Sequence, residues 1–93
     1  MITTYRPSSD VLASHLDEET VLLHLGSKRY HRLNATAAAI WRILEANPSD
    51  TATLAARMVA EFEVTVDEAE SAVGEHLGQL TARELVVVVE DAG

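Results

Sequence analysis

Four histidines and a group of carboxylates are the residues of this 93-residue chain that are best suited to chemistry. The histidines are His15, His24, His31 and His76. No two of them have the i,i+4 spacing of a helical metal site, and the chain has no cysteine that could supply a thiolate. The sequence therefore predicts no metal site, no disulfide and no cofactor, with the histidines on the surface or half buried.

The carboxylates gather on a segment that is typical of a helix, and they include Asp67, Glu68, Glu70 and Glu75. Two of them could act as a general acid and a general base, but a solvated helix face explains the same pattern. No G-x-S-x-G turn accompanies them, and the glycines form no phosphate-binding loop. We therefore expect a protein that is not an enzyme, with unrecognised carboxylate chemistry as the alternative.

The net charge of −8 is unevenly distributed along the chain. Residues 1–60 contain six acidic and six basic residues, whereas residues 61–93 contain nine acidic residues and only Arg83. A phosphate-binding surface needs the opposite balance. The chain also has no signal-peptide pattern at its start and no apolar run near the ~18 residues of a membrane span. We expect a soluble, cytoplasmic protein with no nucleic-acid and no membrane partner.

A short basic segment stands out in this acidic chain. Lys28, Arg29 and Arg32 surround Tyr30 and His31 in a stretch that is typical of a strand. Charged side chains on an edge strand often serve only to prevent aggregation. The alternative is strand addition, in which an extended peptide pairs with the strand's backbone while the basic side chains attract acidic residues of the peptide. We favour strand addition.

Three strands are expected in the first third of the chain, after a loose lead-in over residues 1–9. They span Val11–Leu16, Thr20–Leu25 and Lys28–Leu33. The second and third strands would form a hairpin around Gly26-Ser27, either with this two-residue turn or with a longer loop that changes the register. Leu85–Val89 is an apolar run that predicts a closing strand, and residues 91–93 are expected to be a loose end.

Three helices are expected to follow the hairpin. Their predicted N-caps are Asn34 for a helix over Ala35–Ala46, Ser49 or Asp50 for the second helix, and Thr65, in a Thr65-x-x-Glu68 capping box, for the third. The order predicts a single α+β domain over residues 1–93, winged helix-turn-helix-like, with a three-stranded antiparallel sheet followed by three helices. In a DNA-binding winged helix the third helix enters the major groove, where its carboxylates would be repelled by phosphates.

The third helix has an apolar stripe that consists of Val66, Ala69, Val73, Leu77 and Leu80. A shoulder beside the stripe is formed by Ala69, Ala72, Val73 and His76. Either a wide buried face or one wall of a groove explains this shoulder. Gly74 and Gly78 each cost about 0.8–1 kcal/mol relative to alanine inside a helix, so they predict a close contact with a neighbouring element.

Several of these segments together resemble the PqqD-like family. They are Val21-Leu22-Leu23-His24-Leu25, Tyr30-His31-Arg32-Leu33-Asn34, Ala37-x-x-Ile40-Trp41-x-x-Leu44, and the capped third helix with Val73, Leu77 and Leu80, followed by Leu85. The resemblance covers about residues 5–90. It implies a recognition element for the precursors of ribosomally made, post-translationally modified peptides (RiPPs), a small winged-helix-like domain with three strands and three helices.

The resemblance also implies how such a domain works. Members bind the leader segment of a precursor peptide as an added antiparallel strand, between the third strand and the third helix, and deliver it to partner enzymes. Carried over by position, the contact residues would be Lys28, Arg29, Tyr30, His31, Arg32, Leu33, Ala69, Ala72, Val73 and His76. The Ile40-Trp41 form is most similar to the free-standing proteins of lasso-peptide biosynthesis, which implies a leader peptidase and a cyclase as partners.

The chain departs from the family pattern at several positions, and these departures rank the alternative functions. Members from quinone-cofactor biosynthesis usually carry a Pro-Glu-Arg turn in the hairpin and an Asp-Gly after the first helix. This chain has Gly26-Ser27-Lys28 and Asn47-Pro48 at those places, so that pathway is the second interpretation and a DNA-binding winged helix the third. Many relatives have Asp in place of Ala72 and an aromatic residue in place of His76, which implies an altered groove chemistry here.

Overall fold

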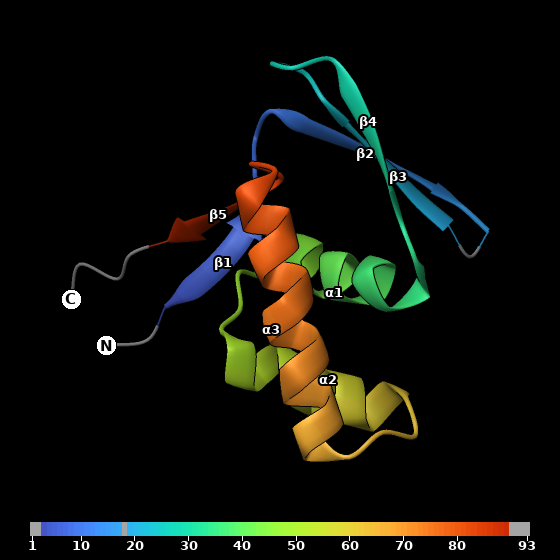
Figure 1. The fold of residues 1–93 in the computed structure, drawn as a ribbon, viewed down its shortest axis with the longest axis vertical. Helices are drawn as coiled ribbons and strands as arrows, with labels where there is room; N and C mark the ends of the chain where they lie inside the picture. The colour runs from blue at the N-terminus through green and yellow to red at the C-terminus, as the bar shows by residue number, and fades with distance from the viewer. Residues whose placement is uncertain (1–2, 18, 90–93) are drawn as a thin grey trace.

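The computed structural model describes residues 3–17 and 19–89. Its elements, in chain order, are β1 (Thr4–Pro7), β2 (Val11–Leu16), β3 (Glu19–His24), β4 (Arg29–Leu33), α1 (Ala35–Ala46), α2 (Thr51–Glu61), α3 (Val66–Ala82) and β5 (Val86–Val89). The molecule is flat, 37 × 35 × 20 Å, with the β2–β3–β4 sheet and the β1–β5 pair on different sides of α3 (Figure 1). The predicted α+β class, a three-stranded sheet followed by three helices, is confirmed.

The three-stranded sheet has the order β2–β3–β4, and both pairings are antiparallel. Side chains alternate between its two faces along β3. Thr20, Leu22 and His24 are buried on the inner face, which packs on the helices, whereas Val21 and Leu23 are half buried on the outer face. Among the described residues β4 pairs only with β3, so its other edge is open.

A four-residue loop joins β3 to β4. The Nδ1 atom of His24 accepts hydrogen bonds from the backbone N–H groups of Gly26 and Ser27, at 3.1 and 3.2 Å. Lys28 closes the loop with a left-handed φ of 63° and therefore lies outside the regular strand. The longer-loop alternative is correct, and β4 begins one residue later than expected because Lys28 belongs to the loop.

The N-terminal segment forms a strand that was not expected. β1 pairs antiparallel with β5 along its whole length. Tyr5 of β1 also exchanges backbone hydrogen bonds of 2.8 and 3.1 Å with Ser49. The expected loose lead-in over residues 1–9 is therefore wrong for β1, because the closing strand needs a partner for its N–H and C=O groups and β1 supplies it. The loose end expected at residues 91–93 lies outside the described residues.

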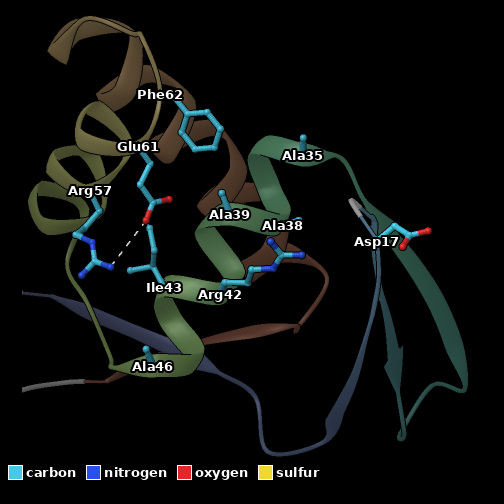
Figure 2. Close-up of a pocket in the computed structure, with 10 residues that line it drawn as sticks. All are labelled: Asp17, Ala35, Ala38, Ala39, Arg42, Ile43, Ala46, Arg57, Glu61 and Phe62. Atoms are coloured by element: carbon cyan, nitrogen blue, oxygen red, sulfur yellow. Dashed lines mark ion pairs between the residues drawn. The ribbon is translucent and has the colours of Figure 1, made fainter.

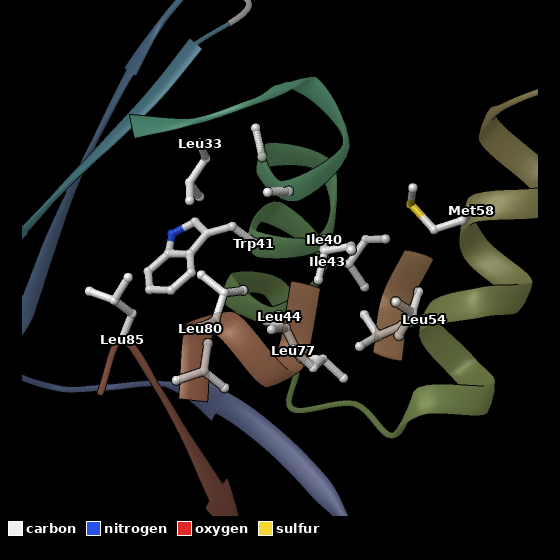
Figure 3. Close-up of a cluster of buried hydrophobic side chains, with 14 of the residues drawn as sticks. Leu33, Ile40, Trp41, Ile43, Leu44, Leu54, Met58, Leu77, Leu80 and Leu85 are labelled. Atoms are coloured by element: carbon white, nitrogen blue, oxygen red, sulfur yellow. The ribbon is translucent and has the colours of Figure 1, made fainter. Parts of the chain in front are cut away.

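The helices surround a core that is centred on Trp41 (Figure 3). Asn34 caps α1 by accepting a hydrogen bond from the N–H of Ala37 at 2.8 Å. Asp50 caps α2 in the same way, through the N–H of Thr53 at 2.7 Å. The largest contribution to the core comes from α1, with Ala37, Ala38, Ile40, Trp41, Ile43 and Leu44 buried. None of the described helices is long and apolar enough to cross a bilayer.

α3 begins with the predicted capping box. The Thr65 hydroxyl accepts from the N–H of Glu68 at 3.1 Å, and the Glu68 carboxylate accepts from the N–H of Thr65 at 3.2 Å. The buried stripe consists of Ala69, Val73, Leu77 and Leu80. Val66 was expected in this stripe but is 56% exposed, because it is the first helical residue and lies beyond the edge of the core.

The close contact expected at Gly74 and Gly78 does not exist. Apart from its chain neighbours and the adjacent backbone of α3, a Cβ atom at either position would meet no described atom within 4 Å. At 100° per residue, both glycines project on the side of α3 that faces away from Ala72 and His76. The two glycines therefore weaken the helix without any packing that requires them.

Candidate peptide-binding site

The open edge of β4 presents the backbone groups of alternate residues. The N–H of Leu25 donates to the carbonyl of Asp10 at 2.8 Å, which extends the β2–β3 ladder and sets its phase. In antiparallel strands, pairs of residues that share hydrogen bonds alternate with pairs that do not. Leu23 and Val21 of β3 therefore bond to β2, and Leu22 between them bonds to its partner on β4, which is His31. The N–H and C=O groups of Tyr30 and Arg32 therefore point away from the sheet, where an added strand would pair.

The side chains of β4 are divided between the two faces of the sheet. Tyr30 lies on the outer face and is 71% exposed. Arg32, on the same face, donates to both carboxylate oxygens of Glu19, at 2.7 and 2.8 Å. His31 is half buried on the inner face, and Leu33 is buried in the core. Tyr30, His31 and Arg32 are therefore the β4 residues that remain accessible in the middle of the strand.

A small hollow of about 60 Å³ lies between β4 and α3. It is lined by the end of β4, the start of α1 and the C-terminal half of α3, through Arg32, Leu33, Asn34, Ala37, His76, Gln79, Leu80 and Arg83. A single water needs about 10–15 Å³ of such space, so the hollow has room for a small side chain. A strand paired with β4 could place one of its side chains there.

Positive charge gathers on the inner side of β4. Burial lowers the pKa of His31, and the nearby charges of Arg83, Arg29 and His24 lower it further. His31 is therefore mostly neutral at pH 7. Arg83 was not among the predicted contact residues. The available sign was that Arg83 is the only basic residue of the acidic segment 61–93.

Two of the four α3 residues expected to line the groove lie in the core instead. Ala69 is 2% exposed and Val73 is 0% exposed, because the stripe that carries them packs on the other helices. Ala72 and His76 are half buried, and His76 lines the hollow. The wide-buried-face alternative therefore holds for Ala69 and Val73, and only Ala72 and His76 stay candidates for contact with a peptide.

The edge of β2 is also unpaired among the described residues, but its surroundings differ. The Nδ1 atom of His15 lies 3.0 Å from the hydroxyl of Thr20, and its Nε2 atom lies 3.0 Å from the carboxylate of Glu45. The contact with Glu45 connects β2 to α1, whereas Thr20 lies on the neighbouring strand β3. β2 contains no Lys or Arg and does not line the hollow beside α3. Of the two open edges, β4 is therefore the better candidate for peptide binding.

A larger hollow of about 550 Å³ lies between α1 and α2 (Figure 2). Alanine side chains of α1 form much of its floor. Arg57 and Glu61 of α2 form an ion pair of 3.9 Å at its rim. No residue of β4 or α3 lines it, so this hollow is separate from the candidate site. Within residues 3–17 and 19–89, no three His, Asp or Glu side chains gather to hold a metal ion.

The fold and the site together define a winged-helix-like α+β domain with an open sheet edge, the geometry that accepts an extended peptide as an added strand. The chain belongs to the PqqD family. Residues 19–86 match the family described as Coenzyme PQQ synthesis protein D (PqqD). The matched segment includes β3, β4 and the three helices, so the predicted family is confirmed.

Two solved structures are similar to nearly the whole chain. One is "TbiB1 in Complex with the TbiA(beta) Leader Peptide", with 30% identity, a TM-score of 0.83, and coverage of 92% of this chain and 99% of that chain. The other is "Lasso peptide synthetase B1 complexed with the leader peptide", with 26% identity, a TM-score of 0.78, and coverage of 89% and 96%. No curated protein matches the sequence. The predicted likeness to lasso-peptide proteins is therefore confirmed.

Proposed function

We propose that this protein binds the leader segment of a ribosomally made precursor peptide by strand addition at β4 and presents it to processing enzymes. One observation carries the mechanism. Within the part of the chain that the structure describes, the backbone groups of Tyr30 and Arg32 are unpaired at a sheet edge that borders a hollow shared with α3. The two similar solved structures hold leader peptides, which supports the same class of ligand for this chain.

The surroundings of the edge would give the bound peptide its affinity and its specificity. Main-chain hydrogen bonds to β4 supply affinity that does not depend on the leader's sequence. Alternate side chains of the leader would turn toward the hollow, where His76 and Arg83 meet apolar atoms of the core. The positive charge of Arg29 and Arg83 near this edge favours acidic residues in the leader.

Fluorescence anisotropy with a labelled cognate leader peptide tests this function. Saturable binding at low micromolar concentration or tighter is expected, because main-chain pairing and one seated side chain act together. The same peptide with its sequence scrambled is the matched control, since it keeps the composition and charge but loses the pattern of alternate side chains. No binding of the cognate leader at several hundred micromolar would contradict the proposal.

The same proposal names partner enzymes. The chain would act as an adaptor in the cytoplasm that delivers the leader-bearing precursor to a leader peptidase and to an ATP-dependent cyclase. The resemblance to free-standing lasso-peptide proteins supports these partners. Catalysis would belong to the enzymes, and the contribution of this chain would be to hold the leader in one position.

The second candidate is a peptide chaperone of quinone-cofactor biosynthesis, and the family's description favours it. The two candidates share the β4 edge and differ only in the peptide that is bound. Competition separates them: an unlabelled quinone-cofactor precursor and an unlabelled lasso leader are each titrated against a bound labelled leader. Displacement by the quinone-cofactor precursor at a lower concentration would favour the second candidate.

A further inference from the structure

The hollow between β4 and α3 differs in charge from the rest of this acidic chain. The chain has fifteen acidic and seven basic residues, yet no Asp or Glu is among the eight residues that line the hollow. Arg32 and Arg83 are two of these residues, and Asn34 and Gln79 add side-chain amides. The hollow therefore offers positive charge and hydrogen-bond donors, which together suit a negatively charged acceptor.

Arg83 supplies a positive charge that no described carboxylate neutralises. Within residues 3–17 and 19–89 it forms no ion pair, whereas Arg32 is bound to Glu19. Glu84, the next residue along the chain, has a left-handed φ of 59° and lines a different hollow beside β5. Arg83 also lies close enough to His31 to lower its pKa, so its charge acts on the inner side of β4. An anion that enters the hollow would therefore meet an uncompensated guanidinium group.

A second donor without a partner lies in the core beside the hollow. The Nε1 atom of Trp41 is buried and has no hydrogen-bond acceptor among the described residues. Leu33 and Leu80 line the hollow and belong to the same core cluster as Trp41, and the indole nitrogen lies on the side of the ring that faces Leu33 (Figure 3). Buried donors nearly always have an acceptor. This N–H group therefore also favours a ligand that brings an acceptor into the hollow.

Strand geometry decides which side chain of the leader enters the hollow. Residues that face each other across paired strands have their side chains on the same face of the sheet. Leader residues opposite Tyr30 and Arg32 would therefore point outward, and those opposite His31 and Leu33 would point inward. Leu33 lines the hollow and His31 does not. The leader residue opposite Leu33 is therefore the one whose side chain would enter it.

We propose that the hollow is a carboxylate subsite, which selects leader peptides that carry Asp or Glu at the position opposite Leu33. This inference rests on the proposed leader-binding function and names the class of leader that the site takes. The carboxylate would accept from Arg83 and from the NH₂ group of Asn34, whose Oδ1 atom already accepts from the N–H of Ala37. Charge-assisted hydrogen bonds are about twice as strong as neutral ones, so this position would dominate the choice of leader.

A charge reversal tests the subsite. The probe is the labelled leader of the precursor encoded beside this protein, with each Asp and Glu replaced in turn by Asn and Gln. One replacement is expected to weaken binding about tenfold in anisotropy, and the others only slightly. Arg83→Glu should weaken binding of the unmodified leader about tenfold or more. It should recover affinity for a leader with Lys at the sensitive position, because the two charges are then exchanged.

Arg57→Glu is the matched control. It changes the net charge by the same amount on α2, outside the hollow, and should leave leader affinity unchanged. Circular dichroism confirms that both variants are folded. Trp41 is the only tryptophan, so its indole N–H gives a single ¹H–¹⁵N signal, which should shift when the unmodified leader binds and shift less with the neutral replacement.

Three results would overturn the subsite while leaving leader binding intact. They are equal affinities of Arg83→Glu and Arg57→Glu for the leader, tolerance of every acidic replacement, and an indole signal that does not move at saturating leader. Absence of binding between the unmodified protein and the unmodified leader would instead overturn the proposed function.

Discussion

At the scale of single residues, the backbone and the side chains of β4 have different roles in the proposed site. Tyr30 and Arg32 offer the backbone groups, while His31 faces the inner side of the sheet, near Arg83 and the hollow. Replacing one of these residues therefore has different effects according to which group is lost. A proline that removes an outward N–H group differs from an alanine that removes only a side chain.

The first prediction concerns the N–H group of Arg32. Arg32→Pro is expected to weaken leader binding about tenfold or more, because a lost backbone hydrogen bond with an unsatisfied partner costs about 1–3 kcal/mol. Anisotropy with labelled leader measures the change. Arg32→Ala keeps the N–H and loses an exposed, solvent-screened ion pair with Glu19 and the part of the hollow's wall that Arg32 provides, so it should bind the leader more tightly than Arg32→Pro does.

A proline on the other open edge is the matched control. By the same alternation of hydrogen bonds, the N–H of Ala13 points outward from β2. Ala13→Pro should leave leader affinity unchanged, with circular dichroism used to confirm that both proline variants are folded. Loss of binding by Ala13→Pro together with normal binding by Arg32→Pro would place the peptide on β2 instead.

The second prediction concerns pH. The pKa of His31 is lowered in the folded protein, by burial first and then by Arg83 and Arg29. The unfolded chain therefore binds more protons than the folded protein as the pH falls below about 6.5, and stability decreases from there down to the folded-state pKa. His31→Gln should lose less stability than the wild type between pH 7 and pH 5 in urea unfolding. Equal losses in both proteins would contradict this origin of the acid sensitivity.

Some residues of the candidate site could be predicted from the sequence and others could not. The basic strand and the position of His76 beside the buried stripe of α3 follow from residue type and helical spacing. Arg83 was missed because its approach to His31 depends on where α3 ends relative to β4. Ala69 and Val73 were placed in the groove because an apolar helix shoulder looks the same in sequence whether it packs on neighbouring helices or borders a peptide.

At the scale of elements, the helices begin at capping residues that can be recognised locally in the sequence. Strands β1 and β5 instead depend on pairing between the two distant parts of the chain. Asn34, Asp50 and Thr65 each accept a hydrogen bond from a first-turn N–H group, so three helix starts could be predicted. β1 could not be predicted, since its four residues show no apolar alternation and its partner β5 lies at the other end of the chain. Pairing over such a distance leaves no local pattern.

The third prediction concerns the glycines of α3. Gly74→Ala and Gly78→Ala should each raise the free energy of unfolding by up to about 0.8–1 kcal/mol, because alanine favours the helix and its Cβ meets no atom. Urea unfolding measures the change. Leader affinity should stay unchanged, since both positions project away from the side of α3 that carries His76. Destabilisation by either alanine would show that the backbone there needs glycine.

At the scale of the whole molecule, the acidic surface and the two hollows are formed by different sets of residues. The carboxylates of α3 make its exposed side acidic, whereas the hollow beside α3 is bordered by Arg32 of β4 and by Arg83, which directly follows α3. No residue of β4 or α3 lines the hollow between α1 and α2 (Figure 2). A winged-helix fold that carries its acidic residues on the third helix is poorly suited to DNA.

The fourth prediction follows from this distribution of charge. Mobility-shift assays at low salt, with random duplex DNA and about 10 µM protein, should show no complex, because four carboxylates on α3 would face phosphates. A basic winged-helix protein is the positive control. A shifted band that disappears as salt is added would contradict the prediction and favour the DNA-binding alternative.

The pairing of β1 with β5 has a practical consequence for engineering. It brings Thr4 and Val89 opposite each other, on the side of the molecule remote from β4 (Figure 1). A fluorescent reporter or an affinity handle attached next to Thr4 or next to Val89 would therefore lie on this side and leave the β3–β4 hairpin unobstructed. Joining Thr4 to Val89 with a short linker and opening the chain elsewhere should give a circular permutant that keeps the fold.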